Sequence, residues 1–303
     1  MNIEELLHTL FSSIKIQGND IATTSFSKIE PLPPQSNRCA DTPDLFHIFN
    51  LHGACSHVLH VSSDLAPQTK ADEARRILTI EEASTTLSTH ILKPVCHGFI
   101  GEKSFAIYPQ KQGFNSTFEA KIRKLQLRSE ILQCLMDIAE ASCQEVPANR
   151  AREIVFSRFT WLTSTLSWSA VQAIVEKGKS ELENGNWHPR FALDHNDVLY
   201  GNIVTDNKWP NTGNYYFTNW VGANTFGFGV HDILSFSISA GYSKAHISKT
   251  LSKLADKMEV SRHHLIYQYM LSMGELSVNL NDFPVYRYAK KIALELDYLT
   301  QSS

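Results

Sequence analysis

The sequence predicts an α+β protein with two lobes, a small β-rich lobe followed by a larger helical lobe. In the first third, short runs of β-branched and aromatic residues alternate with turn residues, which is typical of antiparallel strands. After about residue 115, apolar residues recur at helical spacing over long segments. We therefore expect one lobe over residues 1–110 and a helical lobe over 111–303.

The small lobe is predicted to contain two hairpins and a helix. Strands at 45–51 and 56–61 form the first hairpin, and residues 95–107 form the second, which turns at Gly101-Glu102. Helical spacing of apolar residues predicts a helix over 70–87 between the hairpins. A short helix, a strand and a proline-rich turn are expected before them, over 3–14, 25–32 and 33–37.

The helical lobe is predicted to begin at Ser116 to Glu119, which form a capping-box pattern. One long helix is expected over 150–183, with Trp161 and Trp168 in the core, ended by Asn184-Gly185-Asn186. Three further helices are expected near the carboxyl terminus, over 247–258, 262–276 and 286–299.

The composition excludes several classes of protein. The 28 basic and 31 acidic residues give a formal net charge of −3, and they form no basic stripe, so we expect no nucleic-acid partner. No apolar stretch approaches the roughly 20 residues that span a bilayer, so we expect no membrane span. The start of the chain does not resemble a signal peptide, and the five cysteines are scattered. These features predict a cytoplasmic protein with free thiols and no Cys/His metal site.

One irregular, polar stretch, Phe191 to Phe236, lies between the helical segments, and such loops usually carry the chemistry of a protein. Within it, His195-Asn196-Asp197 is followed by Asn202. Phosphoryl transfer needs a carboxylate near the attacking hydroxyl and metal-binding oxygens near the nucleotide phosphates, and Asp197 and Asn202 supply both kinds of group.

Simpler interpretations of this stretch stay open. An aspartate after a histidine more often makes a turn or a cap, and Asp206-Asn207 is most simply a turn. Asp194 is expected to be solvated, with an acid of an acceptor site as the alternative. The sequence has no Gly-x-Ser-x-Gly, phosphate-binding Gly-Lys-Ser/Thr or dinucleotide motif, and none of its cysteines has the setting expected of a hydrolase nucleophile.

The His-Asn-Asp-x-x-x-x-Asn-Ile segment resembles the catalytic loop of choline and ethanolamine kinases, and it is similar to the corresponding loop of aminoglycoside phosphotransferases. The resemblance implies a protein-kinase-like fold in which Asp197 is the catalytic aspartate, His195 braces the loop and Asn202 binds metal. Asn219 stands where this family has a metal-binding aspartate. Asp232 matches an aspartate that supports the loop.

The resemblance is weaker in the small lobe. Val58-Leu59-His60-Val61 is similar to the strand that carries a phosphate-binding lysine, with His60 in the place of that lysine. Glu81 or, preferably, Glu82 resembles the helix glutamate that pairs with it. Tyr108 and Gln110 fall where a hinge would hold adenine. Residues 32–37 resemble a glycine-rich turn without its glycines.

The resemblance implies a kinase that uses ATP, or another nucleoside triphosphate, with Mg²⁺. It would phosphorylate a hydroxyl of a small molecule such as an amino alcohol, a sugar or an aminoglycoside. Two departures favour an alternative, a catalytically impaired protein that acts by binding. Asn219 is neutral where Mg²⁺ prefers a carboxylate, and His60 supplies less positive charge than lysine. The acceptor and the oligomeric state are left open.

Overall fold

The computed structural model describes residues 28–31, 44–49, 52–83, 85–113, 118–166, 168–206, 214–279, 292–297 and 299. The chain divides into two compact units. The first unit comprises residues 1–79 and 91–112, and the second comprises residues 80–90 and 113–303. Residues 80–90 thus group with the helical part of the chain, although they precede the boundary expected at residue 110.

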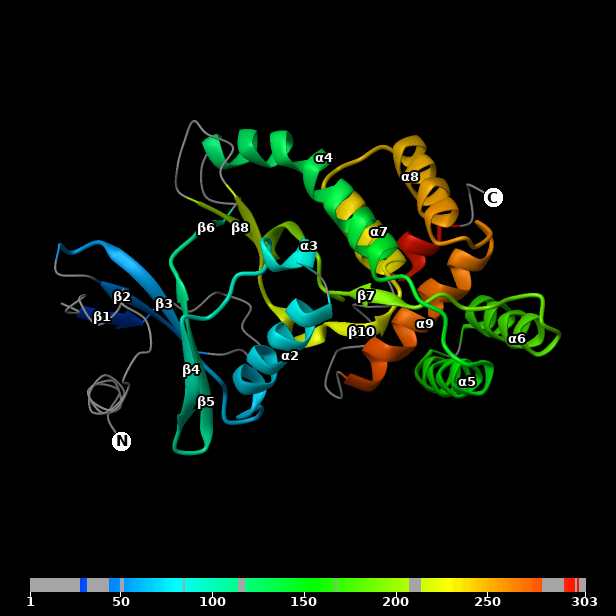
Figure 1. Cartoon of the computed structure of the whole chain (residues 1–303), viewed down its shortest axis with the longest axis horizontal. Helices are drawn as coiled ribbons and strands as arrows, with labels where there is room; N and C mark the ends of the chain where they lie inside the picture. Colours follow the sequence, from blue (N-terminus) through cyan, green and yellow to red (C-terminus); the bar gives the residue numbers. More distant parts are fainter. Residues whose placement is uncertain are drawn as a thin grey trace. The chain divides into compact units, whose positions relative to one another are not determined.

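The first unit contains a five-stranded antiparallel sheet with the order β1-β2-β3-β5-β4 (Figure 1). Both predicted hairpins are confirmed, β2 with β3 and β4 with β5. Alternate side chains on one face form an apolar cluster, because successive strand residues point to opposite faces. The cluster consists of Phe46, Ile48, Leu59, Val61, Phe105 and Ile107. The strands are β1 (Lys28–Pro31), β2 (Asp44–Phe49), β3 (Cys55–Val61), β4 (Cys96–Ile100) and β5 (Lys103–Pro109).

Helix α2 (Thr69–Ala83) follows β3, where a helix over 70–87 was predicted. It ends earlier than expected, and a separate short helix, α3 (Thr85–Ser88), follows. The two-residue strand β6 (Gln112–Gly113) comes after β5 at the point where the chain leaves the first unit.

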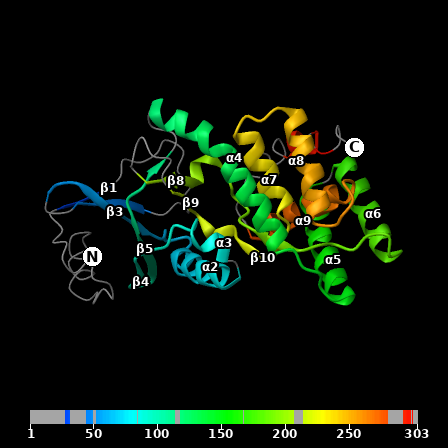
Figure 2. The same ribbon diagram turned by 45° about the horizontal axis from the view of Figure 1, so that its top comes forward.

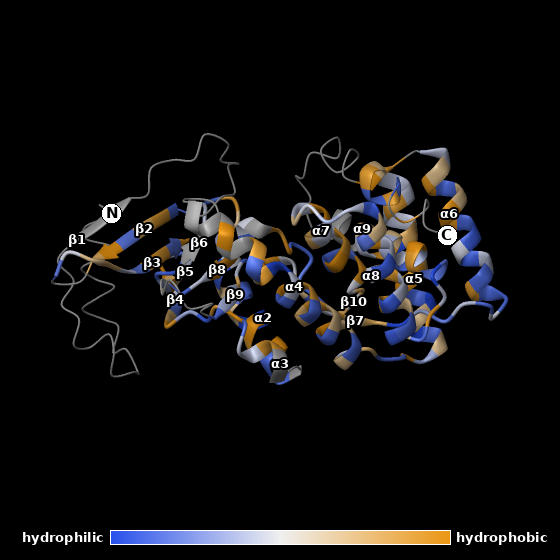
Figure 3. Cartoon of the chain, turned by 90° about the horizontal axis from the view of Figure 1, so that it is seen from above, coloured by the Kyte–Doolittle hydropathy of each residue, from blue (hydrophilic) through white to orange (hydrophobic). Residues whose placement is uncertain are grey.

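The second unit is mainly helical. Its helices are α4 (Phe118–Ala141), α5 (Ala148–Thr165), α6 (Ser169–Glu183), α7 (Val230–Ser239), α8 (Lys244–Lys257) and α9 (His264–Asn279). The outer helices α5, α6 and α8 carry both hydrophilic and hydrophobic residues along their length, as expected for helices with one buried side (Figure 3).

The prediction of a single helix over 150–183 is wrong. The segment forms two helices. The extended backbone of Leu166 ends α5, and Trp168, also extended, precedes the first residue of α6. Trp161 was expected in the core, yet it is 49% exposed. The predicted stop after residue 183 is confirmed, with Gly185 in the left-handed conformation (φ +72°).

Helix α7 was not predicted, because the whole polar stretch was expected to be irregular. Residues 230–237 are all buried, and α7 packs against α4, α8 and α9. It runs between α4 and α8 (Figure 2). A helix buried on every side has no polar face, so its sequence lacks the periodicity on which helix prediction depends.

Two pairs of short strands precede α7 in the sequence. Strand β7 (Ala192–Asp194) pairs with β10 (Asn224–Gly227), and β8 (Ile203–Thr205) pairs with β9 (Tyr215–Phe217). No helix within the described residues is long and apolar enough to cross a membrane. The predicted elements at 3–14 and 33–37, and the start of the helix at 286–299, lie outside the described residues.

Candidate active site

The polar loop 195–202 connects β7 to β8, and strand pairing decides what lies next to it. Ile203 of β8 pairs with Phe217 of β9, so the residues before Ile203 and after Phe217 are neighbours. Thr218 donates its backbone N–H to the Asn202 carbonyl over 2.9 Å. The sheet therefore brings the end of the loop against the segment after β9, which begins with Thr218 and Asn219.

Three predicted site residues meet at one carboxylate oxygen. Asn202 and Asn219 each donate an amide N–H to Asp197 Oδ2, and both distances are 2.7 Å. The Asn202 amide also donates to the Asp197 backbone carbonyl over 2.8 Å. Asp197 is half-buried and Asn219 is exposed, so this carboxylate is fixed in position at the protein surface.

His195 is buried and hydrogen-bonded through both ring nitrogens. Its Nε2 lies 2.9 Å from the Thr218 carbonyl, to which it must donate, and its Nδ1 accepts from the Asp197 N–H over 3.3 Å. Burial lowers the pKa of His195 to about 4, against the opposing effect of the Thr218 carbonyl, so the ring is neutral at pH 7. Its geometry is that of a brace that connects the loop to the segment after β9.

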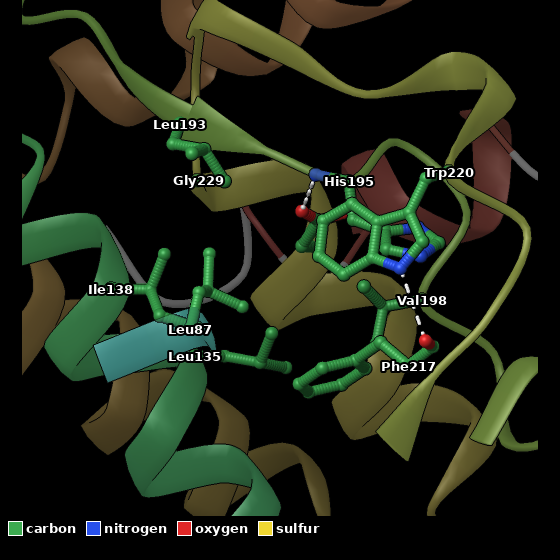
Figure 4. Close-up of a pocket in the computed structure, with 10 residues that line it drawn as sticks. Leu87, Leu135, Ile138, Leu193, His195, Val198, Phe217, Trp220 and Gly229 are labelled. Carbon is green, nitrogen blue, oxygen red and sulfur yellow. Dashed lines mark hydrogen bonds between the residues drawn. The ribbon is translucent and has the colours of Figure 1, made fainter. Parts of the chain in front are cut away.

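Asp232 holds the other side of His195. It lies in the first turn of α7, and its Oδ2 accepts the His195 backbone N–H over 2.5 Å. The pocket beneath this bond is lined mainly by apolar side chains, including Leu135, Val198 and Trp220 (Figure 4). The loop therefore has an apolar support that keeps it rigid.

Asp194 was expected to be solvated, and this expectation is wrong. Asp194 is fully buried, and it accepts hydrogen bonds from the Asn196 amide over 2.8 Å and from the Phe228 N–H over 2.7 Å. Asn196 has left-handed backbone (φ +65°), a conformation that asparagine tolerates better than most residues. Gly227 is also required, because a Cβ there would lie 1.9 Å from an Asp194 oxygen. The sequence offered no signal for this support, since Gly227 is distant along the chain.

The candidate metal ligands, Asn202 and Asn219, are both neutral amides, whereas Mg²⁺ prefers carboxylate oxygens. Asn202 and Asn219 turn their NH₂ groups toward Asp197, so each amide must rotate before its oxygen can bind an ion. The set fits a weakly held Mg²⁺ that competes with the hydrogen bonds to Asp197. Within the described residues, this site included, no group of three His, Cys, Asp or Glu side chains is placed to hold a metal.

In the first unit, His60 lies in β3, the strand predicted to carry the phosphate-binding position. Burial lowers the pKa of His60 to about 3, with a further contribution from the positive charge of Lys70. His60 is therefore neutral and cannot replace a lysine cation. Its ring packs against Tyr108, with the ring centroids 4.9 Å apart.

The role of Glu82 stays a prediction. Glu82 is exposed near the end of α2, whereas Glu73 is buried on the same helix and forms an ion pair with Lys70. The sequence did not predict this pair, because helical spacing alone does not show which charged residue of α2 is turned inward.

Tyr108 and Gln110 lie at the end of β5 and beyond it. The Tyr108 side chain is buried, and burial raises its pKa, with a further contribution from Glu73. Gln110 donates its backbone N–H to the Ser56 carbonyl over 2.9 Å. The Tyr108 ring is thus part of the packing of this unit.

No protein-family profile and no curated protein sequence matches this chain. Several solved structures do. The GDP complex of aminoglycoside 2'-phosphotransferase-IIIa has a TM-score of 0.53 at 12% identity, over 99% of this chain and 97% of that chain. A putative fructosamine-3-kinase from Haemophilus somnus has a TM-score of 0.57 at 11% identity, over 99% and 96%. The chain has a protein-kinase-like fold.

A third structure, the ethanolamine kinase of Plasmodium vivax, agrees with this fold. It has a TM-score of 0.52 at 12% identity, over 99% of this chain and 88% of that chain. The protein-kinase-like α+β fold implied by the His195 to Asn202 segment is thereby confirmed. The low identities fit a divergent sequence, and they carry no information about substrate.

Proposed function

We propose that this protein is a kinase that transfers the γ-phosphoryl group of ATP, or of another nucleoside triphosphate, to a hydroxyl of a small molecule. The observation that carries the proposal is the fixed carboxylate of Asp197, held by the amides of Asn202 and Asn219 in a loop braced by His195. A kinase-like fold with an aspartate in this setting is suited to orienting a hydroxyl for attack.

In the proposed reaction, Asp197 accepts the proton of the acceptor hydroxyl as its oxygen forms a bond to the γ-phosphorus. The bond from the γ-phosphorus to the bridging oxygen breaks, and a nucleoside diphosphate leaves. Before the ion binds, the two amide hydrogen bonds hold Asp197 in a single position. Rotated away from Asp197, the amide oxygens of Asn202 and Asn219 would hold Mg²⁺, which when bound neutralises charge on the phosphates.

We propose an acceptor that carries hydroxyl groups, of the size of an amino alcohol, a sugar or an aminoglycoside. The proposal is supported by the structural likeness to an aminoglycoside phosphotransferase, a putative fructosamine kinase and an ethanolamine kinase. A panel drawn from these three classes is therefore the first to test.

Nucleotide consumption over this panel tests the role of Asp197. Asp197→Ala should abolish the acceptor-dependent consumption of ATP, because no other group at the loop is placed to take the proton. The control is Asp206→Ala, which removes an acid of the same segment whose Oδ2 accepts a hydrogen bond from Tyr216 Oη over 3.3 Å. Unchanged turnover in a folded Asp197→Ala protein would exclude the proposed role.

A second candidate function is binding of a nucleotide or another ligand without phosphoryl transfer. It is favoured by the neutral Asn219 amide, which donates a hydrogen bond to Asp197 and attracts Mg²⁺ less than a carboxylate in the same place would. Thermal unfolding distinguishes the two functions. A ligand at 100 times its dissociation constant adds about 2.7 kcal/mol to the free energy of unfolding. A shift with nucleotide that depends on Mg²⁺ favours the kinase, and a shift without metal dependence or turnover favours the binding protein.

A further inference from the structure

The first unit contains a buried ion pair at the start of α2. Lys70 Nζ lies 2.6 Å from Glu73 Oε2, and the two side chains are 5% and 2% exposed. The positive charge of Lys70 also acts on His60 of β3, and the Glu73 carboxylate acts on Tyr108 of β5. Three side chains, from two strands and a helix, are therefore grouped around the Lys70 cation.

The backbone at Lys70 is fixed by two buried serines. The Lys70 N–H donates to Ser104 Oγ over 3.0 Å, and Ser62 Oγ donates to the Pro67 carbonyl over 2.6 Å. Ser62 follows β3 and Ser104 lies in β5, and they are hydrogen-bonded to each other by the Ser104 N–H over 2.9 Å. The start of α2 is thus anchored to the sheet, which sets the position of the lysine.

A buried ion pair adds little to the free energy of unfolding. Removing two charges from water costs about as much as their attraction returns, and apolar replacements are often neutral or stabilising. The pair at Lys70 and Glu73 therefore suggests another use for the cation. Protein kinases hold nucleotide phosphates with a strand lysine that is paired with a helix glutamate.

Here the strand position holds His60, which is neutral, and the lysine comes from the helix one turn before its glutamate. We propose that Lys70 is the cation that binds the phosphates of the nucleoside triphosphate, with Glu73 as its positioning partner. This inference rests on the proposed nucleotide-dependent function. The four-carbon stem of lysine allows the ammonium to turn from Glu73 to a phosphate oxygen while its backbone stays anchored.

The test is calorimetric binding of ATP and of adenosine to the full chain, in Mg²⁺ and in chelator. Lys70→Met removes the charge and keeps the volume, and we expect it to weaken ATP binding about tenfold to a hundredfold. Adenosine binding should change less than about threefold, since adenosine has no phosphate for the lysine to contact. The control is Lys103→Met, because Lys103 forms a solvent-exposed ion pair with Asp64 in the same unit.

Two further variants distinguish a loss of phosphate binding from misfolding and from a purely structural role of Lys70. Lys70→Gln/Glu73→Gln neutralises both partners, so that no buried charge is left unpaired, and it should show the same selective loss of ATP. In the Lys70→Met background, His60→Lys returns a cation from the strand and should recover part of the ATP affinity. In the wild-type background the same change would place two ammonium groups together and should not improve binding.

The outcomes separate this inference from the proposed function. If the wild-type protein binds ATP and the Lys70 variants bind it equally well, the assignment of Lys70 is overturned while the kinase proposal stands. An equal loss of ATP and adenosine binding would show a structural role and would also overturn the assignment. If the wild-type protein binds no nucleoside triphosphate, both proposals are overturned together.

Discussion

Replacing Asn219 with aspartate should make the site depend on a divalent cation. Asn219 Nδ2 donates to Asp197 Oδ2 over 2.7 Å, and in Asn219→Asp an acceptor oxygen takes the place of this donor. Asn219 has left-handed backbone (φ +67°), which aspartate also tolerates, so the change acts through charge rather than through backbone strain.

The magnitude follows from the geometry. Losing a hydrogen bond to a charged group costs about 1.5–3 kcal/mol. Two carboxylates about 4 Å apart repel by roughly 1 kcal/mol in water and by roughly 4 kcal/mol at an effective dielectric constant of 20. Because Asn219 is exposed and Asp197 is half-buried, we expect the repulsion energy to be closer to the lower value. We expect the free energy of unfolding to fall by about 3 kcal/mol in chelator.

Urea denaturation in chelator and in Mg²⁺, with and without ATP, measures this effect. Mg²⁺ should restore most of the lost stability, and the Mg²⁺-dependent part of ATP binding should increase relative to wild type. Asn214→Asp adds the same charge at an exposed position before β9 and serves as the control. If Asn219→Asp is as stable as wild type in chelator and gains nothing from Mg²⁺, then Asn219 is not a metal-binding position.

Two further predictions concern the support of the loop. Gly227→Ala should destabilise the protein by about 3 kcal/mol or prevent folding, because its Cβ would lie 1.9 Å from an Asp194 oxygen. Gly201→Ala, where a Cβ meets nothing within 4 Å, should have little effect on the same denaturation curve. The free energy of unfolding should also decrease as the pH is lowered below 6.5. His195 takes up a proton in the unfolded state in this range, whereas in the folded state its pKa is lowered to about 4 and it stays neutral. This linkage contributes about 3 kcal/mol between pH 6.5 and 4, and a folded His195→Gln protein that keeps the full pH dependence would contradict it.

The sequence was informative where local chemistry decides the structure. The hairpin at Gly101-Glu102 depends on a turn and two short apolar runs, and the stop after residue 183 depends on Asn and Gly. The spacing of Asp197 and Asn202 is likewise local, because one short loop carries both residues. These features were predictable without knowledge of the tertiary structure.

Tertiary packing decided the features that were missed. Helix α7 is buried on all sides and therefore lacks an amphipathic pattern. Asp194 is buried because Gly227 leaves room for it, a relation between residues of different strands. Lys70 lies beside the strand at His60 only because buried serines anchor the start of α2, so the sequence directed attention to the strand position instead.

The central claim is that Asp197 directs phosphoryl transfer to a small-molecule hydroxyl. Phosphorus NMR of the products, with Mg²⁺-ATP and the acceptor panel, tests it most directly. We predict a phosphomonoester of at least one acceptor, formed in equal amount with ADP by the wild-type protein and by Asp206→Ala, and absent with Asp197→Asn. If ATP binds but no acceptor phosphate forms, or if Asp197→Asn forms it at the wild-type rate, the claim is contradicted.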